Sequence, residues 1–255
     1  MKRITAMKVL VAGYLFILLG SLASEEGREN LPALLLGGLF VGFIAYLAWL
    51  REEPRRRAMR AEARRLRLRF SRSDTFGILG VPFDLFRRTR RSYGAVANVV
   101  SGPWKGFEIR AFDYAYSVSE DEVREYSCAM VAIPGGWPAL VIRPEDLLTS
   151  VADRLALPDI GFESERFNQA FEVSSDERRF ASAAVDARMM AWLLSLVPRP
   201  GFEIQGRWIL AYRDRVQPWE IESVLSLVAG FVERIPRAVG SIYPEALPPR
   251  PDPRG

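Results

Sequence analysis

Residues 92–118, SYGAVANVVSGPWKGFEIRAFDYAYSV, decide the fold class that the sequence predicts. They contain two strand-like runs, 92–101 and 105–118, rich in the valine, phenylalanine and tyrosine that favour β-structure. Gly102-Pro103-Trp104 separates the two runs and brings together a glycine and a proline, residue types that often form turns. The stretch therefore predicts an antiparallel β-hairpin.

Further strand and helix signals follow this hairpin. Residues 125–133 and 139–143 flank Pro134-Gly135-Gly136 and predict a second hairpin. Residues 202–205 and 208–213 predict another strand pair. Helix starts are predicted at Pro144, at Ser174 with its capping-box partner Glu177, at Asp186 and at Pro218. Because this order has no regular βαβ rhythm, we expect an α+β domain in which three to four helices cover one face of an antiparallel sheet.

Two uncharged hydrophobic segments, residues 9–24 and 31–50, precede this domain. The second has 20 residues, and a helix of that length, at about 1.5 Å per residue, spans a hydrocarbon core of about 30 Å. The two segments predict an N-terminal two-helix transmembrane hairpin, and hence a membrane-anchored α+β fold. An alternative for the first segment is a cleaved signal peptide, with Ser21-Leu22-Ala23 as its small-x-small site.

The charges that flank these segments predict the orientation of the chain. Basic residues precede 9–24 and follow 31–50, whereas the loop between them carries three glutamates. Because positive flanks favour the cytoplasm, we expect a multi-pass protein of the cell membrane whose N-terminus and C-terminal domain are cytoplasmic. The predicted organisation is a transmembrane anchor over 1–50, a basic juxtamembrane segment over 51–69, a soluble α+β domain over 70–243 and a disordered tail over 244–255.

Positive charge is concentrated in the N-terminal part of the chain. Residues 1–69 contain 13 basic and 6 acidic side chains, which leaves 22 basic against 25 acidic for residues 70–255. Nucleic acid is therefore a poor partner, because a domain that binds phosphates carries its positive charge on the folded module. The basic segment predicts contact with anionic lipid headgroups, or serves only as a topology signal. The candidate lipid-binding residues are Arg55, Arg56, Arg57, Arg60, Arg64 and Arg65.

The composition excludes many enzyme mechanisms. The chain has no histidine and one cysteine, Cys128, which removes Ser-His-Asp, Cys-His and zinc–histidine chemistry. Three carboxylates, Asp113, Glu163 and Glu165, are weak candidates for acid–base catalysis or for a divalent cation. The alternative is that these side chains cap or bond the backbone next to them. We predict no metal and no cofactor, and an enzyme is the less favoured class.

The motifs FDYAY (112–116), FESERFNQAFEV (162–173) and DERRFASAAVDARMMAWLL (176–194) resemble those of an uncharacterised family of bacterial membrane proteins. Its pattern is FDY followed by FES-x-x-FN-x-x-F-x-V. The likeness extends upstream to ANVVSGPWKG (97–106) and covers most of residues 66–240. The resemblance implies a domain of unassigned function and supplies no catalytic residues.

These observations favour a non-enzymatic, membrane-tethered cytoplasmic module that binds a protein partner or an anionic lipid surface. One alternative is a membrane-bound hydrolase or metal-dependent enzyme that uses the carboxylates named above. Another is a small subunit of a larger membrane complex.

Overall fold

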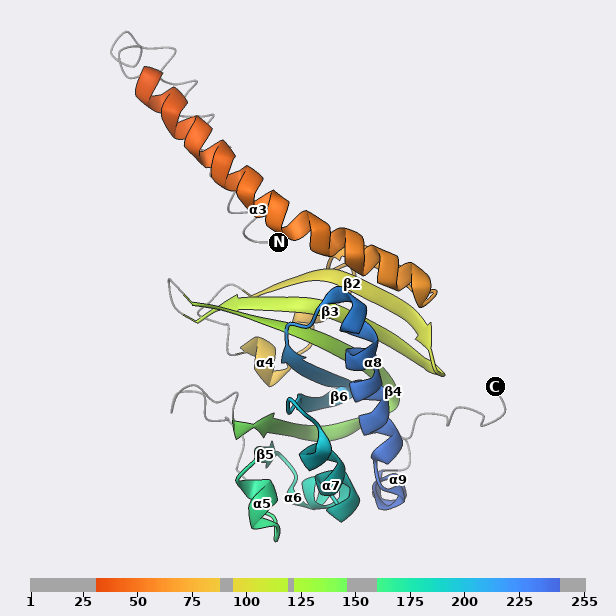
Figure 1. The fold of residues 1–255 in the computed structure, drawn as a ribbon. Helices are drawn as coiled ribbons and strands as arrows, with labels where there is room; N and C mark the ends of the chain where they lie inside the picture. Colours follow the sequence, from red (N-terminus) through yellow and green to blue (C-terminus); the bar gives the residue numbers. More distant parts are fainter. Residues whose placement is uncertain (1–30, 88–93, 119–121, 146–159, 244–255) are drawn as a thin grey trace. The chain divides into compact units, whose positions relative to one another are not determined.

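The structure, a computed structural model, describes residues 31–87, 94–118, 122–145 and 160–243 (Figure 1). The chain divides into two compact units, Met1–Ala58 and Met59–Gly255. All the described strands belong to the second unit.

The predicted transmembrane hairpin is wrong. Within the ranges just given, no helix combines the length and the apolar character needed to cross a bilayer. Helix α3, Leu31–Arg65, includes segment 31–50, but it continues through Pro54 into the arginine-rich residues. Segment 9–24 lies outside the described residues. The membrane-anchored fold class is therefore corrected to an α+β domain with helices packed on an antiparallel sheet.

Six described strands form one antiparallel sheet. The predicted hairpin over 92–118 is confirmed, because β2 and β3 pair from Ala95 with Ala115 to Trp104 with Phe107. Its predicted turn is wrong, because Gly102-Pro103-Trp104 belongs to β2 and the chain reverses at Lys105 and Gly106, which both have positive φ. The strand order is β1-β2-β3-β4-β5, and β6 pairs with β4. The strands are β1 (Arg69–Ser73), β2 (Ala95–Trp104), β3 (Phe107–Ser117), β4 (Val123–Pro144), β5 (Phe171–Ser175) and β6 (Gly201–Asp214).

The predicted second hairpin is wrong. Strand β4 runs on through Pro134-Gly135-Gly136, and its pairing with β6 shifts register on both sides of Trp137. The reason is that β6 pairs with both halves of β4, so the chain bends at these residues instead of reversing. Strand β6 is likewise one strand and not a pair, and Gly206, opposite Trp137, has a left-handed φ of 58°.

Two of the predicted helix starts are confirmed. Asp186 caps α7 by accepting a hydrogen bond from Met189 N at 2.8 Å, and Pro218 begins the short helix η5 that leads into α8. The start at Ser174 is wrong, because Ser174 pairs with Val141 in the sheet. The helix expected after Pro144 falls on residues 146–159, outside the described residues. The later helices are α5 (Glu165–Asn168), α6 (Arg178–Ala184), α7 (Ala187–Ser195), η5 (Pro218–Glu220), α8 (Ile221–Arg234) and α9 (Arg237–Ile242).

Both faces of the sheet are covered, whereas helices were expected on one face alone. The larger core includes Phe180, Leu193 and Phe231 of α6, α7 and α8, and it takes in Met59 and Ala63 from the end of α3. A smaller core on the opposite face forms where η1 (Ile78–Gly80) and α4 (Asp84–Arg87) pack against β3, β4 and β6. The segment between β1 and β2 therefore supplies the second layer on that face.

Candidate binding surfaces

Asp113 lies in a buried hydrogen-bond network. Its Oδ2 accepts a hydrogen bond from Asn98 Nδ2 at 2.8 Å and lies 3.8 Å from Arg215 Nη2. Its Oδ1 accepts from the Ser127 hydroxyl at 3.4 Å, and that hydroxyl accepts from Val216 N at 3.1 Å. The carboxylate is 6% exposed and joins β2, β3, β4 and the segment after β6. This arrangement matches a structural polar group whose acceptor oxygens are already bonded.

Glu163 and Glu165 lie elsewhere, at the start of α5. Both are exposed, and the residue between them, Ser164, caps α5 by accepting from Phe167 N at 3.3 Å. Glu165 accepts from Gln169 Nε2 at 3.3 Å. Among the described residues, no three Asp, Glu, His or Cys side chains gather as they would around a metal ion. The three candidate carboxylates therefore do not form a common site in the described structure.

A buried ionic cluster was missed by sequence reasoning. Arg143, 1% exposed, donates to Asp84 Oδ2 at 2.6 Å and lies 3.6 Å from Glu172 Oε2. Glu203, 2% exposed, accepts hydrogen bonds from the backbone N–H groups of Asp84 at 2.6 Å and Leu85 at 2.9 Å. The cluster fixes α4 against β4, β5 and β6. The only signal in the sequence was that each of two short, mostly apolar predicted strands contains one charged residue. These are Arg143 in 139–143 and Glu203 in 202–205.

Cys128 is fully buried in β4, and burial raises the pKa of its thiol well above the ordinary value. The nearby carboxylates Asp113 and Glu203 raise this pKa further. A thiol of this kind stays protonated at neutral pH and is a poor nucleophile.

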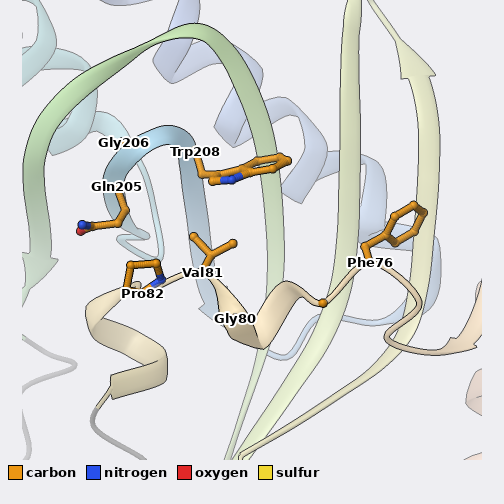
Figure 2. Close-up of a pocket in the computed structure, with 8 residues that line it drawn as sticks. Phe76, Gly80, Val81, Pro82, Gln205, Gly206 and Trp208 are labelled. Atoms are coloured by element: carbon orange, nitrogen blue, oxygen red, sulfur yellow. The ribbon is translucent and has the colours of Figure 1, made fainter.

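An open groove lies between the turn that precedes α4 and the bend of β6 (Figure 2). One wall consists of Phe76, Gly77, Gly80, Val81 and Pro82, and the other consists of Gln205, Gly206 and Trp208. The groove has a volume of about 470 Å³. Asp74 holds the first wall in place, because its carboxylate accepts hydrogen bonds from Phe76 N at 2.9 Å and Leu79 N at 3.4 Å.

Arg110 of β3 contacts two of the residues that line this groove, Phe76 and Trp208. Its guanidinium carbon lies 4.3 Å from the Phe76 ring centroid and 4.8 Å from that of Trp208, so both rings stack against the cation. No carboxylate in the described part of the chain forms an ion pair with it. Partial burial lowers the pKa of Arg110, and the charges of Asp74 and Glu108 oppose that shift. The group stays protonated at neutral pH, because an arginine side chain is not deprotonated in proteins. We call this surface the aromatic groove.

The six predicted lipid-binding arginines differ in their surroundings. In the first unit, Arg55 is half-buried, while Arg56 and Arg57 lie 3.7 and 3.6 Å from the Glu53 carboxylate. In the second unit, Arg65 pairs with Glu62 at 2.6 Å and with Glu222 of α8 at 2.9 Å, contacts that raise its pKa.

The remaining two, Arg60 and Arg64, are exposed, and Arg60 stacks over the Phe70 ring at 5.3 Å. Three further arginines that the sequence prediction did not include follow them and are also exposed: Arg67, Arg69 and Arg72. Residues 59–73 thus hold six arginines against one acid, Glu62. We call this stretch the arginine segment.

A solved structure shares this fold. It is the crystal structure of the mycobacterial trehalose monomycolate transport factor A, TtfA, with a TM-score of 0.51 and 14% sequence identity. The alignment covers 71% of this chain and 96% of that one. At 14% identity the likeness to TtfA shows the fold alone. No model of a protein family matches the chain, and no curated protein matches it.

Proposed function

We propose that this chain is a non-enzymatic binding module that associates with an anionic lipid surface through its arginine segment, residues 59–73. The observation that carries the proposal is the exposure of all six of its arginines beside a single acid. That acid, Glu62, is already paired with one of these arginines, Arg65. The exposed guanidinium groups therefore face solvent with little neutralising charge from the segment itself.

Packing of α3 explains why these charges point outward. Met59 and Ala63 are four residues apart, which places them on one side of the helix, and both are fully buried in the larger core. Arg60 and Arg64 therefore lie on another side of the helix, where they are exposed. An arginine near an anionic leaflet contributes about 1 kcal/mol. Five such residues supply enough free energy for reversible surface binding.

The choice of a binding module over an enzyme rests on the chemistry of the candidate residues. The chain has no histidine, Asp113 is bonded within the protein, and the Cys128 thiol is buried. The TtfA structure is described as a transport factor, and by analogy of fold we propose an accessory role for this module. We also propose that the FDY and FES-x-x-FN-x-x-F-x-V pattern marks a bacterial family. The cytoplasmic placement of the module stays a prediction.

Vesicle co-sedimentation of the full chain tests the proposal. Affinity is measured for phosphatidylcholine vesicles that contain phosphatidylglycerol and for vesicles that lack it. The ratio of the two affinities gives the electrostatic contribution to binding. In the triple variant Arg64→Gln, Arg67→Gln and Arg69→Gln, that ratio should fall about a hundredfold, since about 3 kcal/mol is removed. The matched control changes three exposed arginines of α6 and α7, Arg178→Gln, Arg179→Gln and Arg188→Gln.

The control variant carries the same change in net charge on different helices and should bind like the wild type. Equal losses in both triple variants would show that only net charge matters, and the arginine segment would then have no special role. Equal binding of the wild type to neutral and anionic vesicles would overturn the proposal itself. Raising the salt concentration should weaken the anionic binding, because exposed charges are screened.

A further inference from the structure

We propose that the aromatic groove binds an extended segment of a protein partner that presents a carboxylate beside a large apolar side chain. This site uses Arg110, Phe76 and Trp208, none of which belongs to the arginine segment. The proposal therefore goes beyond association with a lipid surface, and the two proposals can be tested independently.

The position of Arg110 indicates the charged part of the ligand. Its guanidinium carbon lies 4.3 and 4.8 Å from the centroids of two aromatic rings, and these cation–π contacts restrict its orientation before a ligand arrives. The N–H donors of the group lie at its edge, and no carboxylate in the described part of the chain pairs with them. A planar fork of donors that is held in place matches a carboxylate, which can accept two parallel hydrogen bonds.

The rim of the groove indicates the apolar part. Phe76, which lines the groove, is 44% exposed, although it is a large hydrophobic residue that would gain free energy from burial. Trp208, which also lines the groove, is partly buried against the smaller core. A lone inorganic anion would leave these side chains in water, whereas a leucine or an aromatic residue next to the carboxylate would cover them.

The glycines of the groove indicate that a polypeptide backbone can approach closely. A Cβ atom built on Gly77, Gly80 or Gly206 would meet no other atom within 4 Å, so the space above all three is open. Gly77 and Gly206 have left-handed φ angles of 66° and 58°, which favour glycine. The volume of about 470 Å³ is sufficient for one or two side chains of a segment that passes along the surface.

Gly80 provides a way to fill the groove without altering the fold. Its φ is not left-handed, and an added side chain would extend into open space. Gly80→Met should therefore obstruct the groove while leaving the thermal stability of the protein unchanged. Gly161 meets the same conditions and does not line the groove, so Gly161→Met is the matched control. Arg110→Gln removes the cation, and Arg110→Lys keeps the charge but removes the planar fork.

The experiment selects ligands from a random dodecapeptide library displayed on phage, with the immobilised full chain as target. Enriched peptides are resynthesised with a fluorescein label, and their affinity is measured by anisotropy. We expect an Asp or Glu adjacent to Phe, Trp or Leu in the enriched peptides. Affinity should fall about tenfold or more in Gly80→Met and Arg110→Gln, and less in Arg110→Lys, while Gly161→Met binds normally.

A second comparison tests the carboxylate directly. Replacing the acidic residue of an enriched peptide by its amide should weaken binding to the wild type but not to Arg110→Gln, because the partner of the carboxylate is already gone. Peptides whose binding is insensitive to both Gly80→Met and Arg110→Gln would overturn the inference, as would an amide peptide that binds as well as the acid. Loss of anionic-vesicle binding in these two variants would assign the groove to the lipid surface instead and would also overturn it.

Discussion

Arg143 should be among the residues on which the stability of this domain depends most. Its side chain is 1% exposed, and its guanidinium donates to Asp84 at 2.6 Å and lies 3.6 Å from Glu172. In Arg143→Met the hydrophobic stem of the side chain is retained, but Asp84 and Glu172 lose the cation that neutralises them. Breaking a buried ion pair by removing one partner costs about 3–5 kcal/mol. That is a large share of the stability of a typical domain, about 5–15 kcal/mol.

Urea unfolding at equilibrium measures this loss, through the midpoint and the slope of the transition. Adding Asp84→Asn to Arg143→Met should recover part of the loss, with a coupling energy of about 1–3 kcal/mol in the double-mutant cycle. The control Arg188→Met removes an exposed arginine of α7 and should stay within about 0.5 kcal/mol of the wild type. If Arg143→Met were equally mild, the assignment of a stabilising ionic cluster beneath α4 would be refuted.

Two further substitutions test packing and titration. In Gly201→Ala the new Cβ would lie 2.2 Å from Cζ of the buried Tyr212 ring. The free energy of unfolding, measured in urea, should therefore drop by about 1–3 kcal/mol. A variant as stable as the wild type would show that the ring can move aside. Desolvation, with the hydrogen bond from its hydroxyl to Glu177, raises the pKa of Tyr243 to about 12. The stability that Tyr243 provides should therefore be complete below pH 10, its ordinary pKa, and be lost as the pH rises towards 12. The difference in tyrosinate absorbance between wild type and Tyr243→Phe measures this pKa, and Glu177→Gln should lower it; an unchanged titration in Glu177→Gln would contradict the stated cause.

Local sequence signals were sufficient where neighbouring residues decide the structure. Residues 92–118 predicted the β2–β3 hairpin, although not the position of its turn, because the two strands lie next to one another in the chain. Asp186 predicted its helix cap for the same reason. Pro134-Gly135-Gly136 gave the same kind of turn signal, but the hairpin that it predicted is wrong, because β4 continues through these residues. Whether such residues reverse a strand or bend it depends on β6, which lies far along the chain.

The candidate surfaces depended even more on distant residues. Phe76 and Trp208 are far apart in sequence, and nothing near Arg110 indicated that both rings would stack on it. The burial of Arg143 likewise depends on Asp84, which approaches from α4. Basic composition pointed to Arg60, Arg64 and Arg65, which are all exposed, but it could not show that Arg65 is paired with Glu222 of α8. A run of charged residues can be identified from the sequence. Whether acidic partners neutralise those charges depends on residues that only the fold brings close.

The bend shared by β4 and β6 has a consequence for folding. The first half of β4 pairs with β3 and with the end of β6, while its second half pairs with β5 and the beginning of β6. Each of these two strands is therefore common to both halves of the sheet. Neither half can open without disrupting strands that the other needs, so the domain should unfold as one cooperative unit, with similar hydrogen-exchange protection in both halves of β4.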